Sequence, residues 1–138
     1  GLAMLMGELL TTVQLGLPIK IVVINNGTLG FVEMEMKASG HPGTNVALRN
    51  PDFAEVARAI GLHGIRVEDS DALEPALREA FAHDGPALVD VVTARHELSV
   101  PPRIEAAQAK GFSLYMLRAV LSGRGDEVLE LAAANLLH

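Results

Sequence analysis

Apolar residues recur along the chain in two patterns, one typical of short buried strands and the other of helices. The stretch Ile19–Asn25 is apolar apart from Lys20 until it stops at the turn-forming residues Asn25-Asn26-Gly27. A β-branched apolar run this short predicts a strand buried on both faces, as in a parallel sheet. Similar runs predict two further strands, over Gly64–Val67 and Ala87–Thr93.

Helical spacing of apolar residues precedes and separates these strands. It predicts a helix over Leu2–Leu15 that is ended by Gly16, and one over Asp52–Ile60 that is ended by Gly61. A third helix is predicted over Asp71–Ala82, where Asp71 and Glu74 resemble a capping box. Its expected buried face consists of Leu73, Ala76, Leu77, Ala80 and Phe81.

A shorter helical stretch, Phe31–Lys37, follows the first strand. We expect it to turn Met34 inward and to leave Glu33 and Glu35 in solvent, because charged side chains are usually exposed. Residues 38–50 carry Gly, His, Pro, Thr and Asn without periodicity, which predicts a loop.

The order of these elements predicts an α/β fold, a partial doubly wound parallel sheet with helices on both faces. A helix that leads directly into a buried parallel strand implies an earlier strand, so we expect the N-terminal strand or strands of the domain to precede Gly1. Residues 1–94 form the expected α/β core, and residues 95–138 a connector with a helical tail.

The tail contains two predicted helical stretches. Ile104–Leu121 is expected to form one or two helical segments around Gly111. Asp126–Leu137 is amphipathic, with an apolar stripe of Val128, Leu129, Ala132 and Leu136.

Composition removes several classes of function. The net charge of −6 argues against binding nucleic acid, which requires clustered Lys and Arg. The absence of cysteine excludes disulfides and thiolate–zinc sites. The five histidines are scattered without the spacing of metal ligands.

The end of the first strand is the candidate for chemistry. In open α/β sheets ligands bind beyond the carboxyl ends of the strands, where Asn25 and Asn26 fall. Asparagine and backbone carbonyl oxygens are ligands for hard cations such as Mg²⁺ or Ca²⁺. Asn-Asn-Gly is also a common turn, and in that case the chain would be a non-catalytic α/β interaction module.

The residues up to Thr28 resemble the end of the thiamine diphosphate (ThDP) signature, in which Gly-Asp-Gly is followed further along by Asn-Asn. Two longer stretches, GELLTTVQLGLPIKIVVINNGTLGFVEMEMK and AKGFSLYMLRAVLSGRGDEVLELA, resemble the flavin-dependent pyruvate dehydrogenase (quinone) branch of the pyruvate oxidase family. Acetolactate synthases share the Asn-Asn and the following Leu-Gly. They typically continue with an Arg/Trp/Gln-rich segment, which Phe31–Lys37 lacks.

This resemblance implies roles for individual residues. Asn26 would offer its side-chain oxygen and Thr28 its backbone carbonyl to Mg²⁺, which bridges to the ThDP diphosphate, while Asn25 would order the turn. The remaining cofactor-binding residues implied are Gly1, just past the Gly-Asp-Gly, and Leu29, Gly30 and Phe31 on the thiazolium side. Phe31 could equally pack at the edge of the sheet.

The resemblance also implies the reaction. Decarboxylases that release an aldehyde are expected to carry an acid at the position of Val32, so an apolar residue there fits an enzyme that retains the electrons for oxidation. Pyruvate would be oxidatively decarboxylated to acetate and CO₂, with electrons passing through FAD to quinone. A phosphate- and oxygen-using pyruvate oxidase and an acetolactate synthase-like carboligase are the alternatives.

The implied protein is a cytoplasmic homo-oligomer whose FAD is held outside this segment, so we expect the isolated chain to be inactive. In membrane-associated members the C-terminal tail responds to lipid. Asp126–Leu137 has the required stripe but no Lys or Trp. Its composition therefore supports two alternatives equally, a peripheral contact with the membrane or a helix packed on protein.

Overall fold

The computed structural model describes residues 1–95 and 106–136 of the chain, in two compact units. The first unit contains residues 1–25 and 49–93, and the second contains residues 26–48 with the described residues from 94 onward. The chain therefore leaves the first unit between Asn25 and Asn26. The domain boundary at residue 94 stays a prediction, and the structure adds that residues 26–48 pack with the later part of the chain.

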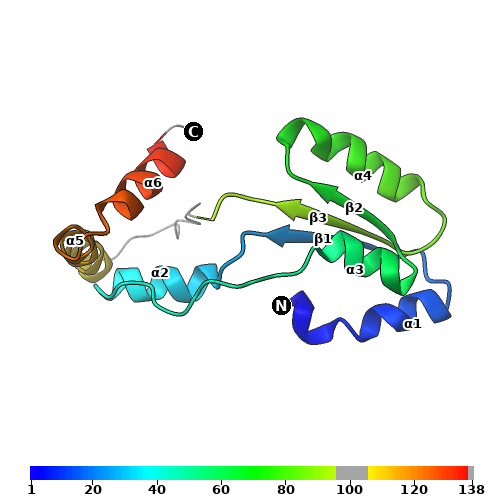
Figure 1. Ribbon diagram of the computed structural model, residues 1–138, viewed down its shortest axis with the longest axis horizontal. Coiled ribbons are helices and arrows are strands. Elements are labelled where there is room, and N and C mark those ends of the chain that lie inside the picture. Colours follow the sequence, from blue (N-terminus) through cyan, green and yellow to red (C-terminus); the bar gives the residue numbers. More distant parts are fainter. Residues whose placement is uncertain (96–105, 137–138) are drawn as a thin grey trace. The chain divides into compact units, whose positions relative to one another are not determined.

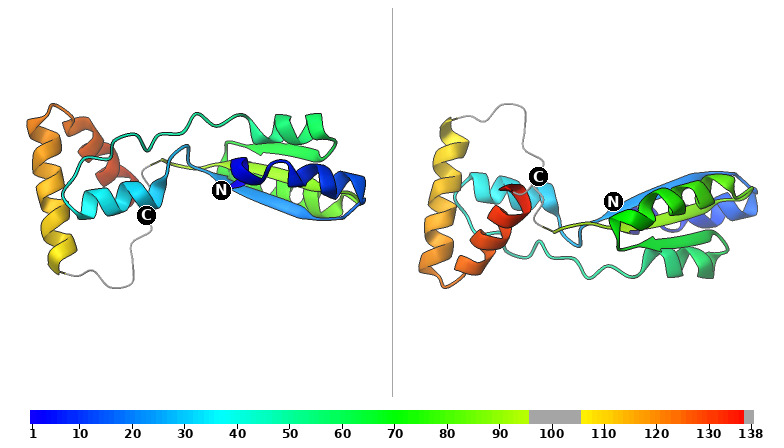
Figure 2. Two further views of the ribbon diagram at one scale, coloured as in Figure 1. Left: turned by 90° about the horizontal axis from the view of Figure 1, so that it is seen from below. Right: turned by 90° about the horizontal axis from the view of Figure 1, so that it is seen from above.

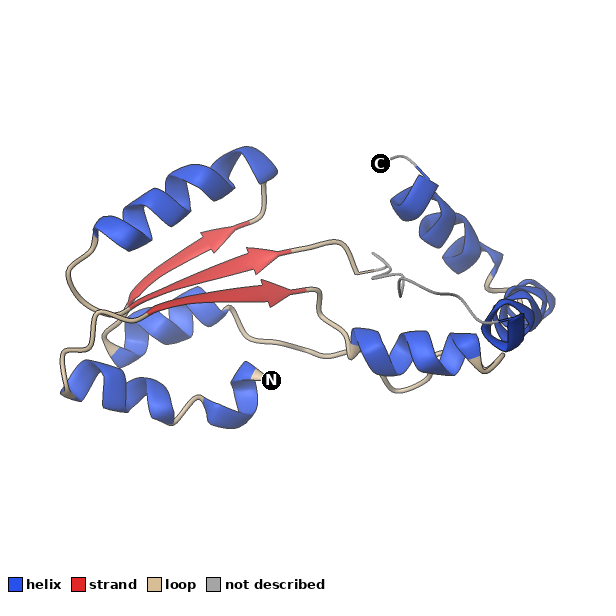
Figure 3. Cartoon of the chain, turned by 180° about the vertical axis from the view of Figure 1, so that it is seen from behind, coloured by secondary structure: helices blue, strands red, loops and turns tan. Residues whose placement is uncertain are grey.

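The first unit is built on three parallel strands (Figure 3). They are β1 (Lys20–Asn25), β2 (His63–Val67) and β3 (Ala87–Val92), in the order β1-β3-β2. Each predicted strand is confirmed to within one residue at either end. In the central strand, Asp90 is level with Val23 on one side and Arg66 on the other.

Helices cover both faces of this sheet, which confirms the α/β fold class (Figure 1). On one face, α4 (Leu73–Ala82) packs Ala76 and Ala80 against Val89 and Val91. On the other face lie η1 (Leu2–Leu5), α1 (Glu8–Gln14) and α3 (Phe53–Ile60), whose apolar residues surround Leu88.

Strand β1 is not buried on both faces, contrary to the sequence prediction. Ile21 and Val23 face the helices α1 and α3, but Val22 is partly exposed and Ile24 is 67% exposed. The reason is that α4 packs over β2 and β3 and does not extend over β1, which is an edge strand among the described residues.

Two details of the first three predicted helices are also wrong. The helix over Leu2–Leu15 is divided into η1 and α1 around Met6 and Gly7, where glycine weakens helix formation. α4 has no side-chain cap, so the predicted Asp71–Glu74 box does not form. Asp69 instead caps η2 (Ser70–Ala72), the short 3₁₀ helix that leads into α4, by accepting a hydrogen bond from the Asp71 amide at 3.0 Å.

The predicted ends of two helices are confirmed. Asp52 caps α3 by accepting a hydrogen bond from the Glu55 amide at 2.9 Å, and Gly61 ends it with a φ of 105°. Gly16 follows α1 with a φ of 60°. In contrast, Phe81 of α4 is exposed, because the helix runs past the apolar surface that the sheet offers.

The second unit is helical. It contains α2 (Gly30–Ala38), α5 (Ala106–Leu121) and α6 (Gly125–Leu136), with α2 and α6 both against α5 (Figure 2). α5 is continuous through Gly111, so of the one or two helical segments expected there the structure has one. A side chain at Gly111 would collide with α2, because a Cβ there would lie 1.7 Å from the Ala38 carbonyl oxygen.

The apolar stripe predicted for α6 is partly wrong. Leu131 is buried in this helix, whereas Leu129 is exposed. Residues 96–103 of the predicted connector, the predicted start of α5 at Ile104 and the side chain of Leu136 lie outside the described residues. No helix in the described part of the chain is both long and apolar enough to span a membrane.

Candidate functional site

The candidate site begins where the chain leaves β1. Thr28 forms an isolated antiparallel pair with Ala47, flanked by hydrogen bonds from the Leu48 amide to the Gly27 carbonyl (2.8 Å) and from the Leu29 amide to the Val46 carbonyl (2.9 Å). In such a pair, the N–H and C=O of the central residue point away from the opposite segment. The backbone of Thr28 is thus fixed, with both of its polar groups directed away from the segment that contains Ala47.

Asn26 satisfies one of these two groups. Its side-chain oxygen accepts a hydrogen bond from the Thr28 amide at 3.2 Å, a local turn that Gly27 permits with a φ of 64°. Gly30 leaves room for this arrangement, because a Cβ at Gly30 would lie 3.1 Å from the Asn26 side-chain nitrogen. Glycine at position 30 therefore leaves room for the Asn26 side chain in this conformation.

The carbonyl of Thr28 is the other group. No donor to this oxygen is found within residues 1–95 and 106–136. A fixed carbonyl next to an asparagine oxygen is a donor set that fits a hard divalent cation. In the described part of the chain no three His, Asp or Glu side chains gather as a metal site, so a cation at this loop would draw its other ligands from a diphosphate, from water or from other residues.

Asn25 has a different role from its neighbour. Its side-chain nitrogen donates to Asp90 at 3.0 Å, and its side-chain oxygen accepts from the Asn50 side chain at 2.8 Å. Both ends of the amide are therefore held by protein. Asn25 is expected to order the turn; in the structure its side chain holds the end of β1 to Asp90 and Asn50 instead.

Asp90 is the residue that sequence reasoning missed. It is completely buried in the central strand, where its carboxylate accepts from Asn25, from the Phe53 amide (3.1 Å) and from Arg66 (2.9 Å). It thereby ties the ends of β1 and β2 to the first turn of α3. The available signal was a single acidic residue within the apolar run ALVDVV.

Arg66 remains charged in this network. Its hydrogen bond to Glu68 at 2.7 Å raises the pKa of the guanidinium above its ordinary value. Partial burial lowers that pKa, and the negative charges of Asp52, Glu68 and Asp90 raise it further. The buried carboxylate of Asp90 therefore faces a permanent cation.

Glu33 is buried, contrary to the prediction that it is exposed. One carboxylate oxygen is 2.9 Å from the Thr28 hydroxyl, and the other is 2.8 Å from the ammonium of Lys37. Both charged side chains are at least nine-tenths buried. The pairing with Lys37, one helical turn later, is what allows a charged residue to be buried here. Glu35 is exposed, as predicted.

The remaining predicted residues differ in their surroundings. Leu29 is partly exposed and Phe31 is 73% exposed, so the alternative in which Phe31 packs at the edge of the sheet is wrong for the described chain. Val32 is also exposed. Gly1 is exposed in the first unit, before η1, whereas the other predicted site residues belong to the second unit.

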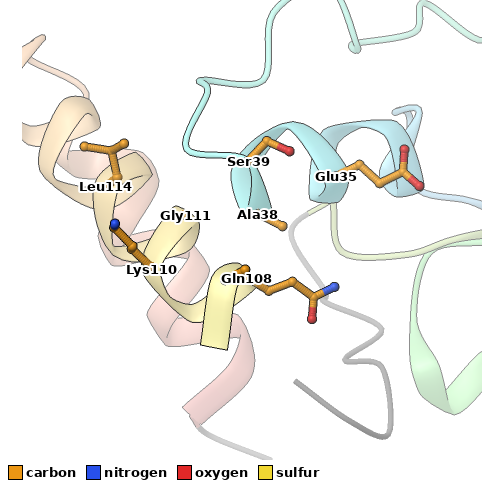
Figure 4. Close-up of a pocket in the computed structure, with 8 residues that line it drawn as sticks. Glu35, Ala38, Ser39, Gln108, Lys110, Gly111 and Leu114 are labelled. Atoms are coloured by element: carbon orange, nitrogen blue, oxygen red, sulfur yellow. The ribbon is translucent and has the colours of Figure 1, made fainter. Parts of the chain in front are cut away.

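A second concave region lies between α2 and α5. It is an open hollow of about 590 Å³ with a mixed polar and apolar lining (Figure 4). Glu35 and Ser39 come from the α2 side, and Gln108, Lys110 and Leu114 come from α5. None of these five is buried, and the lining does not bring buried charged groups together.

Comparison with known proteins identifies a family. Residues 1–91 match the family profile described as thiamine pyrophosphate enzyme, C-terminal TPP binding domain; thiamine pyrophosphate is another name for ThDP. A Bacillus subtilis protein named as thiamine pyrophosphate-containing, YdaP, is 41% identical over 95% of this chain and 23% of its own length. The mitochondrial acetolactate synthase catalytic subunit of Saccharomyces cerevisiae is 36% identical over 64% of this chain and 13% of its own length.

A solved structure supports the same family. The thiamine diphosphate-dependent 4-hydroxybenzoylformate decarboxylase of Rhodococcus jostii RHA1 matches with a TM-score of 0.58 and 28% identity, over 62% of this chain and 16% of that one. The chain thus spans less than a quarter of the length of these relatives. By sequence and by fold, the chain belongs to the family of C-terminal TPP-binding domains of thiamine pyrophosphate enzymes.

Proposed function

We propose that the loop from Asn26 to Thr28 holds Mg²⁺ and, through it, the diphosphate of ThDP. The observation that carries this proposal is the Thr28 carbonyl, which points away from the paired segment, is fixed by backbone hydrogen bonds of both neighbouring residues and has no protein donor in the described residues. The family match supports ThDP as the cofactor, and the neutral oxygen donors support a hard cation. The excess negative charge of a diphosphate would be neutralised by the metal, because the loop itself has no basic residue.

The chain's own contribution to the reaction is to position these groups. When bound, ThDP supplies the electron sink needed to cleave a bond next to a carbonyl carbon. Asn26 and Thr28 would hold the metal end of the cofactor. The exposed apolar side chains of Leu29, Phe31 and Val32 follow directly in the chain and offer an apolar surface with no acid that could protonate a reacting carbon.

For the full-length protein we propose oxidative decarboxylation of pyruvate to acetate and CO₂, with FAD passing the electrons to quinone. Two features of the sequence support this choice. The tail stretch AKGFSLYMLRAVLSGRGDEVLELA resembles the pyruvate dehydrogenase (quinone) branch of the pyruvate oxidase family. In addition, Val32 stands where an aldehyde-releasing decarboxylase is expected to carry an acid. FAD, a homo-oligomeric assembly and a peripheral position at the membrane belong to the same proposal.

An acetolactate synthase-like carboligase is the second candidate. It is favoured by the match to the yeast acetolactate synthase catalytic subunit and to a cyanobacterial acetolactate synthase from Arthrospira platensis, 33% identical over 70% of the chain. Both candidates use the same metal loop. They differ in what happens to the two carbon atoms left after CO₂ is released.

The products distinguish the two candidates. The full-length protein is supplied with pyruvate, ThDP, Mg²⁺, FAD and a soluble quinone analogue, and acetate, acetolactate and reduced quinone are measured. We expect acetate and reduced quinone in equal amounts. Acetolactate without quinone reduction would overturn the oxidative proposal, and the proposed metal site at Asn26–Thr28 would still stand. Asn26→Ala should abolish Mg²⁺-dependent ThDP binding in either case, and unchanged binding in this variant would overturn the proposed metal site.

A further inference from the structure

The Thr28 side chain is held by a buried charged pair that no catalytic role accounts for. Its hydroxyl lies 2.9 Å from a carboxylate oxygen of Glu33 and 3.2 Å from the Val46 carbonyl. Thr28 itself is only 7% exposed. The residue whose carbonyl points away from the paired segment is therefore anchored through its hydroxyl by Glu33.

Lys37 holds Glu33 in turn. The ammonium of Lys37 is 2.8 Å from the second carboxylate oxygen of Glu33, and the two side chains are only 4% and 10% exposed. The same ammonium lies 5.2 Å from the ring centroid of Tyr115, a fully buried residue of α5, in cation–π geometry. The contacts thus run from the loop through α2 to α5, all within the second unit.

The location of this pair argues against a purely stabilising role. A buried ion pair contributes little net stability, because removing two charges from water costs about as much as their attraction returns. Residue 43 also lies close to Glu33. A Cβ at Gly43 would lie 2.9 Å from the Glu33 Cγ, so the close approach of the loop to this side chain favours glycine there. A rigid carboxylate that orients one particular hydroxyl fits a positioning role better than a stabilising one.

We propose that Glu33 is a positioning residue for the metal loop. Supported by Lys37, it fixes the Thr28 side chain and thereby the direction of the Thr28 carbonyl toward the cation. This inference rests on the proposed function, because it assigns a role relative to the Asn26–Thr28 metal site. Partners that orient metal ligands in this way commonly change metal affinity by about 10- to 100-fold when they are removed.

The test measures metal binding directly. Mn²⁺ is titrated into the full-length protein in the presence of ThDP, and free Mn²⁺ is followed by electron paramagnetic resonance. Thr28→Val keeps the backbone carbonyl and the side-chain shape but removes the hydroxyl, and it should weaken Mn²⁺ binding at least about tenfold. Thr28→Ser restores the hydroxyl and should recover most of the affinity. Equal affinity of Thr28→Val and the wild type would overturn the proposal.

Glu33→Gln tests the carboxylate itself, with Glu35→Gln as the matched control, because Glu35 is on the same helix but exposed. Glu33→Gln should weaken Mn²⁺ binding, and Glu35→Gln should leave it unchanged. The double variant Thr28→Val/Glu33→Gln should lose less than the sum of the two single losses, because Thr28→Val removes, and Glu33→Gln weakens, the same contact. Additive losses would overturn the inference.

The outcome is distinguishable from failure of the metal site. If Asn26→Ala abolishes Mn²⁺ binding while Thr28→Val and Glu33→Gln retain it, the metal site stands and the positioning role is wrong. If Asn26→Ala also binds Mn²⁺ normally, the proposed function itself is wrong. A purely stabilising pair would lower the melting temperature of the apoprotein without changing Mn²⁺ affinity, and that result would also overturn the inference.

Discussion

Replacing Asp90 should destabilise the carboxyl end of the sheet without changing any residue of the loop Asn26–Thr28. Asp90→Ala removes the acceptor of three hydrogen bonds, from Asn25, the Phe53 amide and Arg66. The Phe53 amide is the most costly to leave unsatisfied, because Phe53 is buried. Arg66 would not be left without a partner, because it keeps its hydrogen bond to Glu68 at 2.7 Å.

The magnitude follows from these partners. Hydrogen bonds to charged groups contribute about 1.5–3 kcal/mol each, and breaking a buried charge network by removing one member typically costs about 3–5 kcal/mol. We expect Asp90→Ala to lower the free energy of local opening by about 3 kcal/mol, toward the lower end because Arg66 is only partly buried. Asp90→Asn retains one carbonyl acceptor and should cost about half as much.

Hydrogen exchange of the full-length protein measures this effect locally. Since each 1.4 kcal/mol changes an equilibrium tenfold, backbone amides at the start of α3 should exchange about a hundredfold faster in Asp90→Ala. Asp71→Asn is the control, because Asp71 is an exposed acid in the same unit. Equal exchange in Asp90→Ala and the control would refute the reasoning that Asp90 ties the strand ends to α3.

Three further predictions concern packing, the cofactor and the tail. Gly111→Ala should destabilise the second unit by at least about 2 kcal/mol, because its Cβ would lie 1.7 Å from the Ala38 carbonyl oxygen. Hydrogen exchange in α5 that is no faster than in the wild type would contradict this, and Gly125→Ala, where a Cβ would have no atom within 4 Å, is the control. The isolated 138-residue chain should show no turnover and weak ThDP affinity, so sub-micromolar binding of ThDP and Mg²⁺ in calorimetry would disprove that expectation. Removing residues 125–138 from the full-length protein should reduce its flotation with liposomes if the tail contacts lipid, and equal flotation would eliminate that role.

The local pattern of the sequence was sufficient for the order of elements and for much of the fold. The three apolar runs form the three parallel strands, and α3 begins after Asp52 and ends before Gly61, as predicted from their chemistry. These features succeed because they depend on residues close together in the chain. The residues before α4 show the limit of this reasoning, since the predicted Asp71–Glu74 box does not form and Asp69 caps η2 instead.

The failures involve partners that are distant in sequence. The exposed ends of β1 and α4 at Ile24 and Phe81 could not be predicted, because periodicity identifies an apolar face but not how far the opposite layer extends. Asp90 is separated by 65 residues from Asn25 and by 37 from Phe53. Only the pairing of β1 with β3 brings such groups together, so the importance of Asp90 is a property of the topology.

Glu33 illustrates an error of a different kind. The rule that charged residues on a short helix are solvated holds for Glu35 but fails for Glu33, two residues earlier. The sequence did contain a local signal, because Lys37 follows Glu33 by four residues and can pair with it. What the sequence could not supply was the Thr28 hydroxyl and the Tyr115 ring on either side of the pair.

The two adjacent asparagines show how one strand end can serve both fold and chemistry. Asn25 uses its donor and its acceptor on Asp90 and Asn50, so replacing it should disturb the sheet. Within the described residues, the Asn26 oxygen accepts a hydrogen bond from the Thr28 amide alone, which leaves a second lone pair on that oxygen next to the Thr28 carbonyl. A cation that binds there contacts a loop already in place. The cost of ordering that loop is met by Thr28, Glu33 and Lys37 during folding, so it does not reduce the affinity for the metal.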